Sequence, residues 1–176
     1  MTYFINLFLY FYIYSFLGWC CEVVYAYKNQ IKFVNRGFLI GPICPIYGFC
    51  ALSITKMLNS IESNILFLFI FASIVVSLIE YYTGYLLEKT FNKKYWDYSE
   101  DPFNIHGRIC LHFSLIWGIL AVFTAKIINP IITNLFSNIP LYLTIAIFYI
   151  LFSLFIMDIL FTLYTLINKK RNKFIN

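Results

Sequence analysis

Residues 35–48 read NRGFLIGPICPIYG, a charged loop that continues directly into an apolar run. Three glycines and two prolines lie within this short segment. Proline removes a backbone donor and glycine loosens a helix, so the freed backbone groups need partners or water. Broken helix ends of this kind are common binding sites in membrane proteins. We therefore expect a candidate site where this apolar run begins, with backbone groups among its ligands.

The composition around this segment is that of a polytopic membrane protein. Hydrophobic residues make up 61% of the 176 residues, charged residues 12%, and the mean hydropathy is +0.78. These values exclude an ordinary soluble domain. The net charge of +5 comes from basic residues that flank apolar runs, which is a topology signal and not a nucleic-acid footprint. We expect a single integral membrane domain over residues 1–176, embedded in the lipid bilayer and with no nucleic-acid partner.

Five apolar runs are long enough to cross about 30 Å of hydrocarbon. The predicted fold class is therefore all-α, a transmembrane helical bundle. The first run lacks a basic leader and a cleavage site, so we predict a retained helix and not a signal peptide. Asn129 and Pro130 are expected to end the fourth helix, with residues 131–136 at the membrane interface. The predicted spans cover residues 4–24, 38–57, 65–87, 109–128 and 141–167.

The basic residues orient these helices. Eleven of the 13 Lys and Arg residues lie on one side if the N-terminus is outside, and this bias predicts an N-outside, C-inside topology. Residues 88–108 then form a cytoplasmic loop, whose mixed charges and aromatic residues predict an ordered structure at the interface. The predicted inside residues are Lys28, Lys32, Arg36, Lys89, Lys93, Lys94, Arg108, Lys169, Lys170, Arg171 and Lys173.

Two parts of the chain resemble each other. Residues 18–22 (GWCCE) and 84–88 (GYLLE) share a glycine, an aromatic residue and a glutamate at the same spacing. Residues 33–48 and 103–118 share a phenylalanine, a glycine and an aromatic-glycine pair at the same spacing. A parallel repeat of helices 1–2 and 3–4 and a chance similarity both explain this pattern.

Charged side chains inside the predicted spans lie at one level near the inner surface. Glu22 ends the first span, while Glu80 and Asp158 lie in the inner thirds of the third and fifth. An unpaired carboxylate at such a depth costs about 2.5–3.5 kcal/mol, so each should face protein or water. Arg36 and Arg108 begin the second and fourth spans at the same surface, and arginine suits bidentate contact with carboxylate or phosphate.

Two interpretations of these charges remain open. They either pair with one another to hold the bundle together, or part of the set binds a substrate, an anionic headgroup or an ion. The loop of residues 88–108 is expected to act as a lid or interface through Glu88, Trp96, Asp97 and Tyr98. The candidate substrate- or ion-binding residues are Glu22, Asn35, Arg36, Gly41, Pro42, Cys44, Pro45, Tyr47, Glu80, Asn104, Arg108 and Asp158.

Sequence motifs of common enzymes do not occur. The chain has no H-E-x-x-H, G-x-S-x-G or G-x-x-x-x-G-K-[ST] motif, and its five cysteines form no C-x-x-C pair. We therefore expect no metal, no cofactor, no catalytic residue and no enzymatic activity. A Cys44 nucleophile with His106 as its base is the one enzymatic alternative.

The motifs together resemble the ABC-transporter type IV family, also called CmpB-like, over about residues 10–130. The resemblance implies a small bacterial, multi-pass protein of the cytoplasmic membrane related to ABC-transporter permeases, and it brings no substrate or catalytic residue with it. The residues that carry it are Gly18-Trp19 and Glu22, Asn35 to Leu39, Gly41-Pro42, Cys44 to Gly48, Glu88-Lys89 and Phe91, Trp96 to Tyr98, Asn104, Gly107 to Leu111, and Trp117-Gly118.

The resemblance suggests a membrane transport component with a cytoplasm-facing polar site. Because the chain has no nucleotide-binding motif, ATP-driven transport would need a separate ATPase subunit, and residues 88–108 offer the largest cytoplasmic surface for it. Five spans are few for a complete pathway, which favours a homo-oligomer or a larger complex. The alternatives are a membrane-embedded enzyme or lipid-headgroup-binding protein at the inner interface, and an accessory or assembly subunit of a larger membrane complex.

Overall fold

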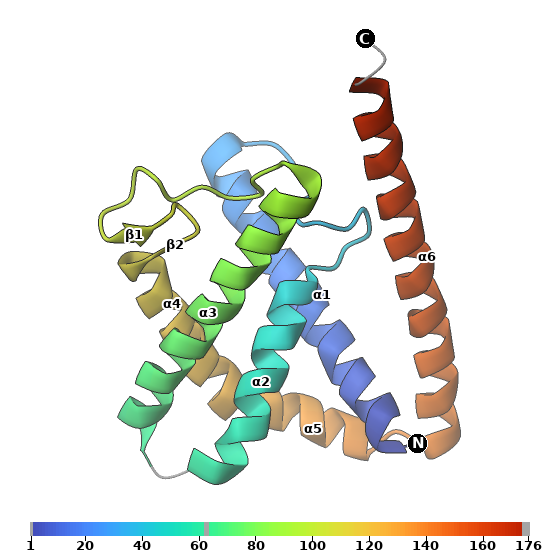
Figure 1. Ribbon diagram of the computed structural model, residues 1–176. Coiled ribbons are helices and arrows are strands. Elements are labelled where there is room, and N and C mark those ends of the chain that lie inside the picture. The colour runs from blue at the N-terminus through green and yellow to red at the C-terminus, as the bar shows by residue number, and fades with distance from the viewer. Residues whose placement is uncertain (1, 62–63, 174–176) are drawn as a thin grey trace. The chain divides into compact units, whose positions relative to one another are not determined.

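The computed structural model describes residues 2–61 and 64–173, and most of these residues are helical (Figure 1). Contacts divide the chain into two compact units, which we call the terminal unit (residues 1–45 and 139–176) and the central unit (residues 46–138). The single domain expected from the sequence stays a prediction. The elements are α1 (Thr2–Gln30), α2 (Pro45–Ile61), α3 (Ile65–Phe91), β1 (Asn104–Ile105), β2 (Ile109–Cys110), α4 (Leu111–Phe123), the π-helical turn η1 (Thr124–Ile128), α5 (Asn129–Ser137) and α6 (Leu141–Lys173).

The terminal unit is held together by aromatic side chains between α1 and α6. The Phe8 ring lies 5.3 Å, between centroids, from the rings of both Phe148 and Phe152, in edge-to-face geometry. Phe11 makes a similar contact with Phe155 at 5.6 Å. Edge-to-face pairs of this kind contribute free energy beyond simple area burial. The loop between α1 and α2 runs from the end of α1 toward α6 (Figure 1).

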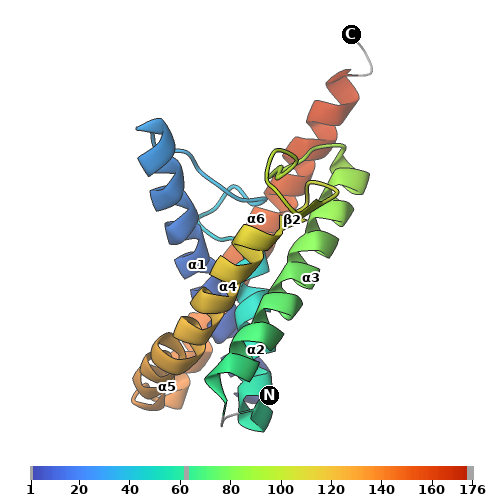
Figure 2. The same ribbon diagram turned by 90° about the vertical axis from the view of Figure 1, so that its left-hand side faces the viewer.

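The central unit is built around the close packing of α3 against α4 (Figure 2). A Cβ atom at Gly118 of α4 would collide with Ser73 and Phe69 of α3, so glycine is required at this contact. Small residues allow such close approach of helices in a membrane, where lipid gives no hydrophobic drive for association. The buried core consists of Cys50, Ile54, Leu68, Ala72, Val76, Ala121 and Ala125, from α2, α3, α4 and η1.

Within residues 2–61 and 64–173, four helical segments are long and apolar enough to span a membrane: Thr2–Lys28, Ile65–Phe91, Leu111–Ser137 and Leu141–Asn168. They contain or overlap the first, third, fourth and fifth predicted spans. The second predicted span, residues 38–57, becomes a helix only at Pro45 and has 17 residues. Proline is favoured in the first turn of a helix, and Gly41 with Pro42 prevents an earlier start. The count of five spans and their orientation stay predictions.

The prediction that Asn129 and Pro130 end the fourth helix is wrong. The helical path continues from α4 through η1 into α5 as far as Ser137. Pro130 occupies one of the first two positions of α5. A proline ring inside an α-helix would clash with the carbonyl four residues earlier, and the wider π-helical turn that precedes Pro130 relieves this conflict. The chain changes direction here instead of ending (Figure 1).

Candidate functional site

Asp158 of α6 binds the broken segment that precedes α2. Its Oδ1 accepts hydrogen bonds from the backbone N–H of Ile40 at 3.1 Å and of Gly41 at 3.0 Å, and Oδ2 accepts from Gly41 at 3.1 Å. The Thr162 hydroxyl donates to Oδ1 at 3.3 Å and accepts from the Ile40 N–H at 3.2 Å. The backbone donors released by the Gly/Pro break thus find a carboxylate, as such groups must in a membrane. We call Trp19, Asn35, Ile40, Gly41, Asp158 and Thr162 the loop cluster.

Asn35 connects this segment to α1. The indole N–H of Trp19 donates to Asn35 Oδ1 at 2.6 Å, and Asn35 Nδ2 donates to the Ile40 carbonyl at 2.6 Å. One side chain therefore uses its acceptor toward α1 and its donor toward the loop. Sequence reasoning had included Asn35 as a candidate, but not Trp19 or Thr162. The signal for Thr162 was its position four residues after Asp158, which places both on one face of the helix.

Glycine is required in this segment for steric reasons. A Cβ at Gly41 would lie 2.6 Å from Asp158 Oδ2. At Gly37, which has φ +123°, a Cβ would lie 2.7 Å from Cys44 Sγ. Cys44 is buried, and its N–H donates to the Ser15 carbonyl of α1 at 3.0 Å. The segment is therefore fitted closely against both helices of the terminal unit.

Arg36 and Glu22 complete the predicted residues of the terminal unit. Arg36 does not pair with Asp158, whose oxygens are taken by backbone donors. Its carbonyl accepts from Cys44 Sγ at 3.4 Å, while its Nε is buried with no hydrogen-bond partner in the described part of the chain. Glu22 is half-buried in α1. Pro42 lies in the loop and Pro45 begins α2.

In the central unit, Arg108 is held by Glu88 and two tyrosine rings. Arg108 Nη2 and Nε lie 2.7 Å and 3.1 Å from Glu88 Oε2. The guanidinium carbon lies 5.5 Å and 5.4 Å from the ring centroids of Tyr81 and Tyr85. The hydrogen bonds that Arg108 donates to Glu88 raise the pKa of Arg108. Tyr81, Tyr85 and Glu88 recur at helical spacing on α3, a signal in the sequence that had been missed.

Glu80, which is buried in α3, is bound by the loop and not by an arginine. The Tyr98 hydroxyl donates to Glu80 Oε1 at 3.0 Å, and the Tyr98 ring stacks on Phe113 of α4 with a centroid separation of 4.8 Å. Arg108 had been a predicted partner of the carboxylates within the spans, but it bonds Glu88, about two turns further along α3. The Tyr98 hydroxyl, and not Arg108, donates the hydrogen bond to Glu80 Oε1.

Trp96 closes the loop over α3. Its indole N–H donates to the Arg108 carbonyl at 2.8 Å. Gly84 makes room for the indole, because a Cβ there would lie 3.2 Å from Trp96 Cζ2. We call Glu80, Gly84, Glu88, Trp96, Tyr98 and Arg108 the hairpin cluster.

Asp97 and Asn104 organise the loop internally. Asp97 bonds Lys94 at 2.9 Å and the Ser99 N–H at 3.1 Å. Hydrogen bonds from Lys94 and then Ser99 lower the pKa of Asp97 to about 2. Asn104 Nδ2 donates to the Asp101 carbonyl at 2.8 Å, and its Oδ1 accepts from the Gly107 N–H at 3.0 Å.

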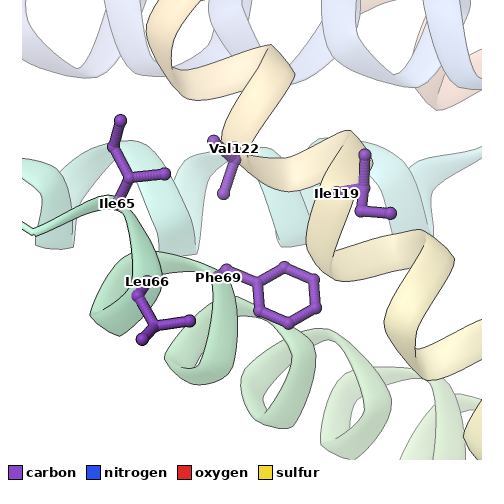
Figure 3. A pocket seen from close by; sticks show the side chains of 5 residues that line it. All are labelled: Ile65, Leu66, Phe69, Ile119 and Val122. Atoms are coloured by element: carbon purple, nitrogen blue, oxygen red, sulfur yellow. The ribbon is translucent and has the colours of Figure 1, made fainter.

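The remaining candidate, Tyr47, packs on Trp117 with a centroid separation of 5.7 Å within the central unit. An open, apolar pocket of this unit lies elsewhere, at the start of α3 (Figure 3). Only aliphatic and aromatic side chains line it: Ile65, Leu66, Phe69, Ile119 and Val122.

The candidate residues thus divide between two clusters. Asn35, Gly41 and Asp158 come together in the terminal unit. Glu80, Glu88, Trp96, Tyr98 and Arg108 come together in the central unit. A single site that contains all the charged candidates stays a prediction, because its members lie in different units.

Long apolar helices, the buried carboxylate of Glu80 and a broken helix entrance are features of an all-α membrane protein. Residues 9–163 match the family described as "Putative ABC-transporter type IV", and the chain belongs to this family. The match extends beyond the part that carried the resemblance in the sequence and includes both clusters. No solved structure matches the chain.

Proposed function

We propose that this protein is the membrane-embedded component of a transport assembly whose energy comes from a separate ATPase subunit. The observation that carries the proposal is the family match over residues 9–163, which covers both polar clusters. The four long apolar helices support a role within the bilayer. The proposal includes five spans in the N-outside, C-inside orientation and a bacterial cytoplasmic membrane, and it assigns no catalytic step to this chain.

The loop cluster is the proposed place of substrate contact. Ile40 and Gly41 direct adjacent backbone N–H groups at one carboxylate, and consecutive N–H groups of this kind bind anions. Asp158 occupies these donors in the structure. An anionic group on a substrate would compete with Asp158 for them, and its binding would release the segment from α6. Broken helix ends have this role in other membrane transporters.

The hairpin cluster is the proposed coupling element. Residues 88–108 form an ordered body fixed to α3 by the Glu88–Arg108 ion pair and the Tyr98–Glu80 hydrogen bond. A rigid body of this kind can transmit the motion of a docked ATPase to α3 and α4. Exposed Lys94, Asp97 and Glu100 offer the charges that such a soluble partner would contact.

The experiment is purification of the tagged protein with its bound subunits from native membranes, followed by reconstitution into vesicles and measurement of ATP hydrolysis. We expect an ATPase subunit to copurify. Asp158→Asn should change ATP hydrolysis several-fold without changing the amount of complex. Ser153→Ala, on the same helix but outside the loop cluster, is the matched control and should leave hydrolysis unchanged.

Two results would overturn the proposal. Preparations with no ATP hydrolysis above that of membranes lacking this chain would exclude the ATPase-coupled role. Loss of the Asp158→Asn protein from the membrane, with Ser153→Ala retained, would show that the loop cluster only holds the fold together. Phospholipid that copurifies in fixed ratio without any ATPase would instead indicate a lipid-headgroup-binding protein.

A further inference from the structure

The hairpin of the central unit presents apolar side chains without a partner in the described part of the chain. Phe103 is 80% exposed and Ile105 is 52% exposed. Residues 102–107, which we call the hairpin tip, contain no Asp, Glu, Lys or Arg. The preceding residues 93–101 carry five charged side chains. The loop is therefore divided into a charged half and an apolar tip.

With α3 spanning the membrane, its contact with His106 places the hairpin tip at the depth of the bilayer. His106 Nδ1 is 3.0 Å from the Tyr81 hydroxyl of α3, and Tyr81 lies about 15 Å along the helix from its last residue, Phe91. The 27 residues of α3 are about 40 Å long and exceed the hydrocarbon core by about 10 Å. When α3 spans the membrane, its C-terminal end can therefore project at most about 10 Å beyond the hydrocarbon core. Tyr81 lies about 15 Å before that end, so it stays within the bilayer.

The hairpin does not extend past the end of α3. In both views it folds back from the last turn of that helix to the start of α4 (Figures 1 and 2). Tyr82 and Leu86 of α3 are exposed, as residues that face lipid would be. The hairpin tip thus lies beside a helix surface suited to lipid.

The backbone of the hairpin is suited to a medium of low polarity. The Arg108 N–H donates to the Ile105 carbonyl at 3.1 Å, and the Tyr98 N–H donates to the Gly107 carbonyl at 2.8 Å. β1 and β2 pair in antiparallel register, with Asn104 opposite Cys110. Backbone groups near lipid must find partners within the protein, and these do so.

Backbone strain also marks the hairpin tip. Phe103 and His106 have φ of 54°, a left-handed conformation that bulky residues rarely adopt. A soluble turn would more simply use glycine or asparagine at such positions. Strained backbone positions cluster at functional sites, and Phe103 combines such a conformation with an exposed aromatic ring.

We propose that the hairpin tip inserts Phe103 and Ile105 into the phospholipid interface, at the boundary between headgroups and acyl chains. Phenylalanine and other apolar side chains of interfacial segments are buried in this layer. Because the hairpin tip carries no formal charge, the contact depends on apolar burial and needs no anionic lipid. Lys94, Asp97 and Glu100 of the charged half are exposed and remain available to a soluble partner.

The test uses the photoreactive phenylalanine analogue benzoylphenylalanine at position 103. The purified chain is reconstituted in vesicles of phosphatidylethanolamine and phosphatidylglycerol, irradiated, and weighed by mass spectrometry. We expect several-fold more phospholipid adduct from position 103 than from position 100, where Glu100 is exposed in the charged half. Position 105 should behave like position 103, and vesicles of phosphatidylcholine alone should give the same adduct yield.

Three results would overturn this inference. Equal phospholipid yields at positions 103 and 100 would show that the hairpin tip does not reach the lipid. Adducts from position 103 to a second copy of the chain would make it an interface between copies. Adducts in native membranes to another subunit, in place of phospholipid, would make it a docking point for that subunit. Folding of each variant is checked by its unchanged thermal unfolding, and no result depends on the presence of an ATPase.

Discussion

At the scale of single residues, the central feature is the contact between Asp158 and the non-helical backbone of Ile40 and Gly41. A carboxylate inside a membrane helix is costly unless it is satisfied. Asp158 meets this requirement with the N–H groups of Ile40 and Gly41. The contact requires close approach, which explains why the position facing the carboxylate is a glycine. The position of the Asp158 side chain therefore requires that residue 41 has no Cβ atom.

We predict that Gly41→Ala destabilises the protein by about 1–3 kcal/mol, the usual cost of overpacking a close contact. The new methyl group would lie 2.6 Å from Asp158 Oδ2. Thermal unfolding of the purified protein in detergent measures the change. In an Asp158→Ala background the same substitution should cost clearly less, because the collision is gone. Equal costs in both backgrounds would contradict the predicted contact.

The sequence marked Gly41 and Asp158 of this contact as candidates, but neither Ile40 nor the pairing of these residues. The Gly/Pro break and the intramembrane carboxylates were visible in the sequence, since both violate the pattern of a plain apolar helix. An arginine was expected as the partner of Asp158, because oppositely charged residues can be recognised in a sequence. Backbone N–H groups are present at every residue except proline, so the sequence does not mark which of them face Asp158.

At the scale of elements, residues 88–108 behave as one folded body. The aromatic and charged composition predicted an ordered loop, and in the structure hydrogen bonds join its residues. Asn104 and Asp97 form its internal hydrogen bonds, while Tyr98 and Arg108 fix it to α3. The short β1–β2 ladder was not predicted, because two-residue strands leave no periodic pattern in a sequence.

We predict that this loop loosens in acid through Asp97. Its pKa in the folded loop is lowered to about 2, so the ionised form stabilises the loop. This stabilisation is complete above the ordinary pKa of an aspartate, near 4, and is lost as the pH falls through about 2. Asp97→Asn should therefore be cut faster than the wild type by pepsin at pH values near 4, and equally fast near pH 2.

The matched control is Glu100→Gln, an exposed acid of the same loop. It should be cut at the wild-type rate at both pH values. If Asp97→Asn and the wild type were cut alike near pH 4, the hydrogen bonds to Lys94 and Ser99 would not stabilise the loop.

At the scale of the whole molecule, the open question is whether α2 crosses the membrane. Its 17 residues are about 25 Å long, slightly short of the hydrocarbon thickness. With α2 crossing, residue 100 lies on the opposite side of the membrane from residue 2. With only the four long helices crossing, residues 2 and 100 share a side.

We predict that α2 crosses, because only then do eleven of the 13 basic residues lie on the cytoplasmic side. Single cysteines at positions 2 and 100, in a background without the native cysteines, are labelled with an impermeant maleimide in intact cells. Position 2 should be labelled, and position 100 should be labelled only after lysis. Labelling of both positions in intact cells would show that α2 does not cross.

Helix existence could be predicted well and helix boundaries less so. Long apolar runs identified every long helix, because spanning a membrane demands both length and hydrophobicity. The start of α2 was placed seven residues too early, since residues 38–44 are apolar without being helical. The path through Pro130 was missed because a π-helical turn depends on backbone geometry that has no sequence motif.

The turn η1 sets the register of the helix that follows it. A π-helical turn contains about one residue more than an α-helical turn. Each residue in an α-helix advances the surface by about 100°. Deleting one residue from Thr124–Ile128 would restore a regular helix and rotate every later side chain of α5 by that angle. Ile132, which is buried, would then turn outward. The extra residue of the π-helical turn thus determines which face of α5 is buried.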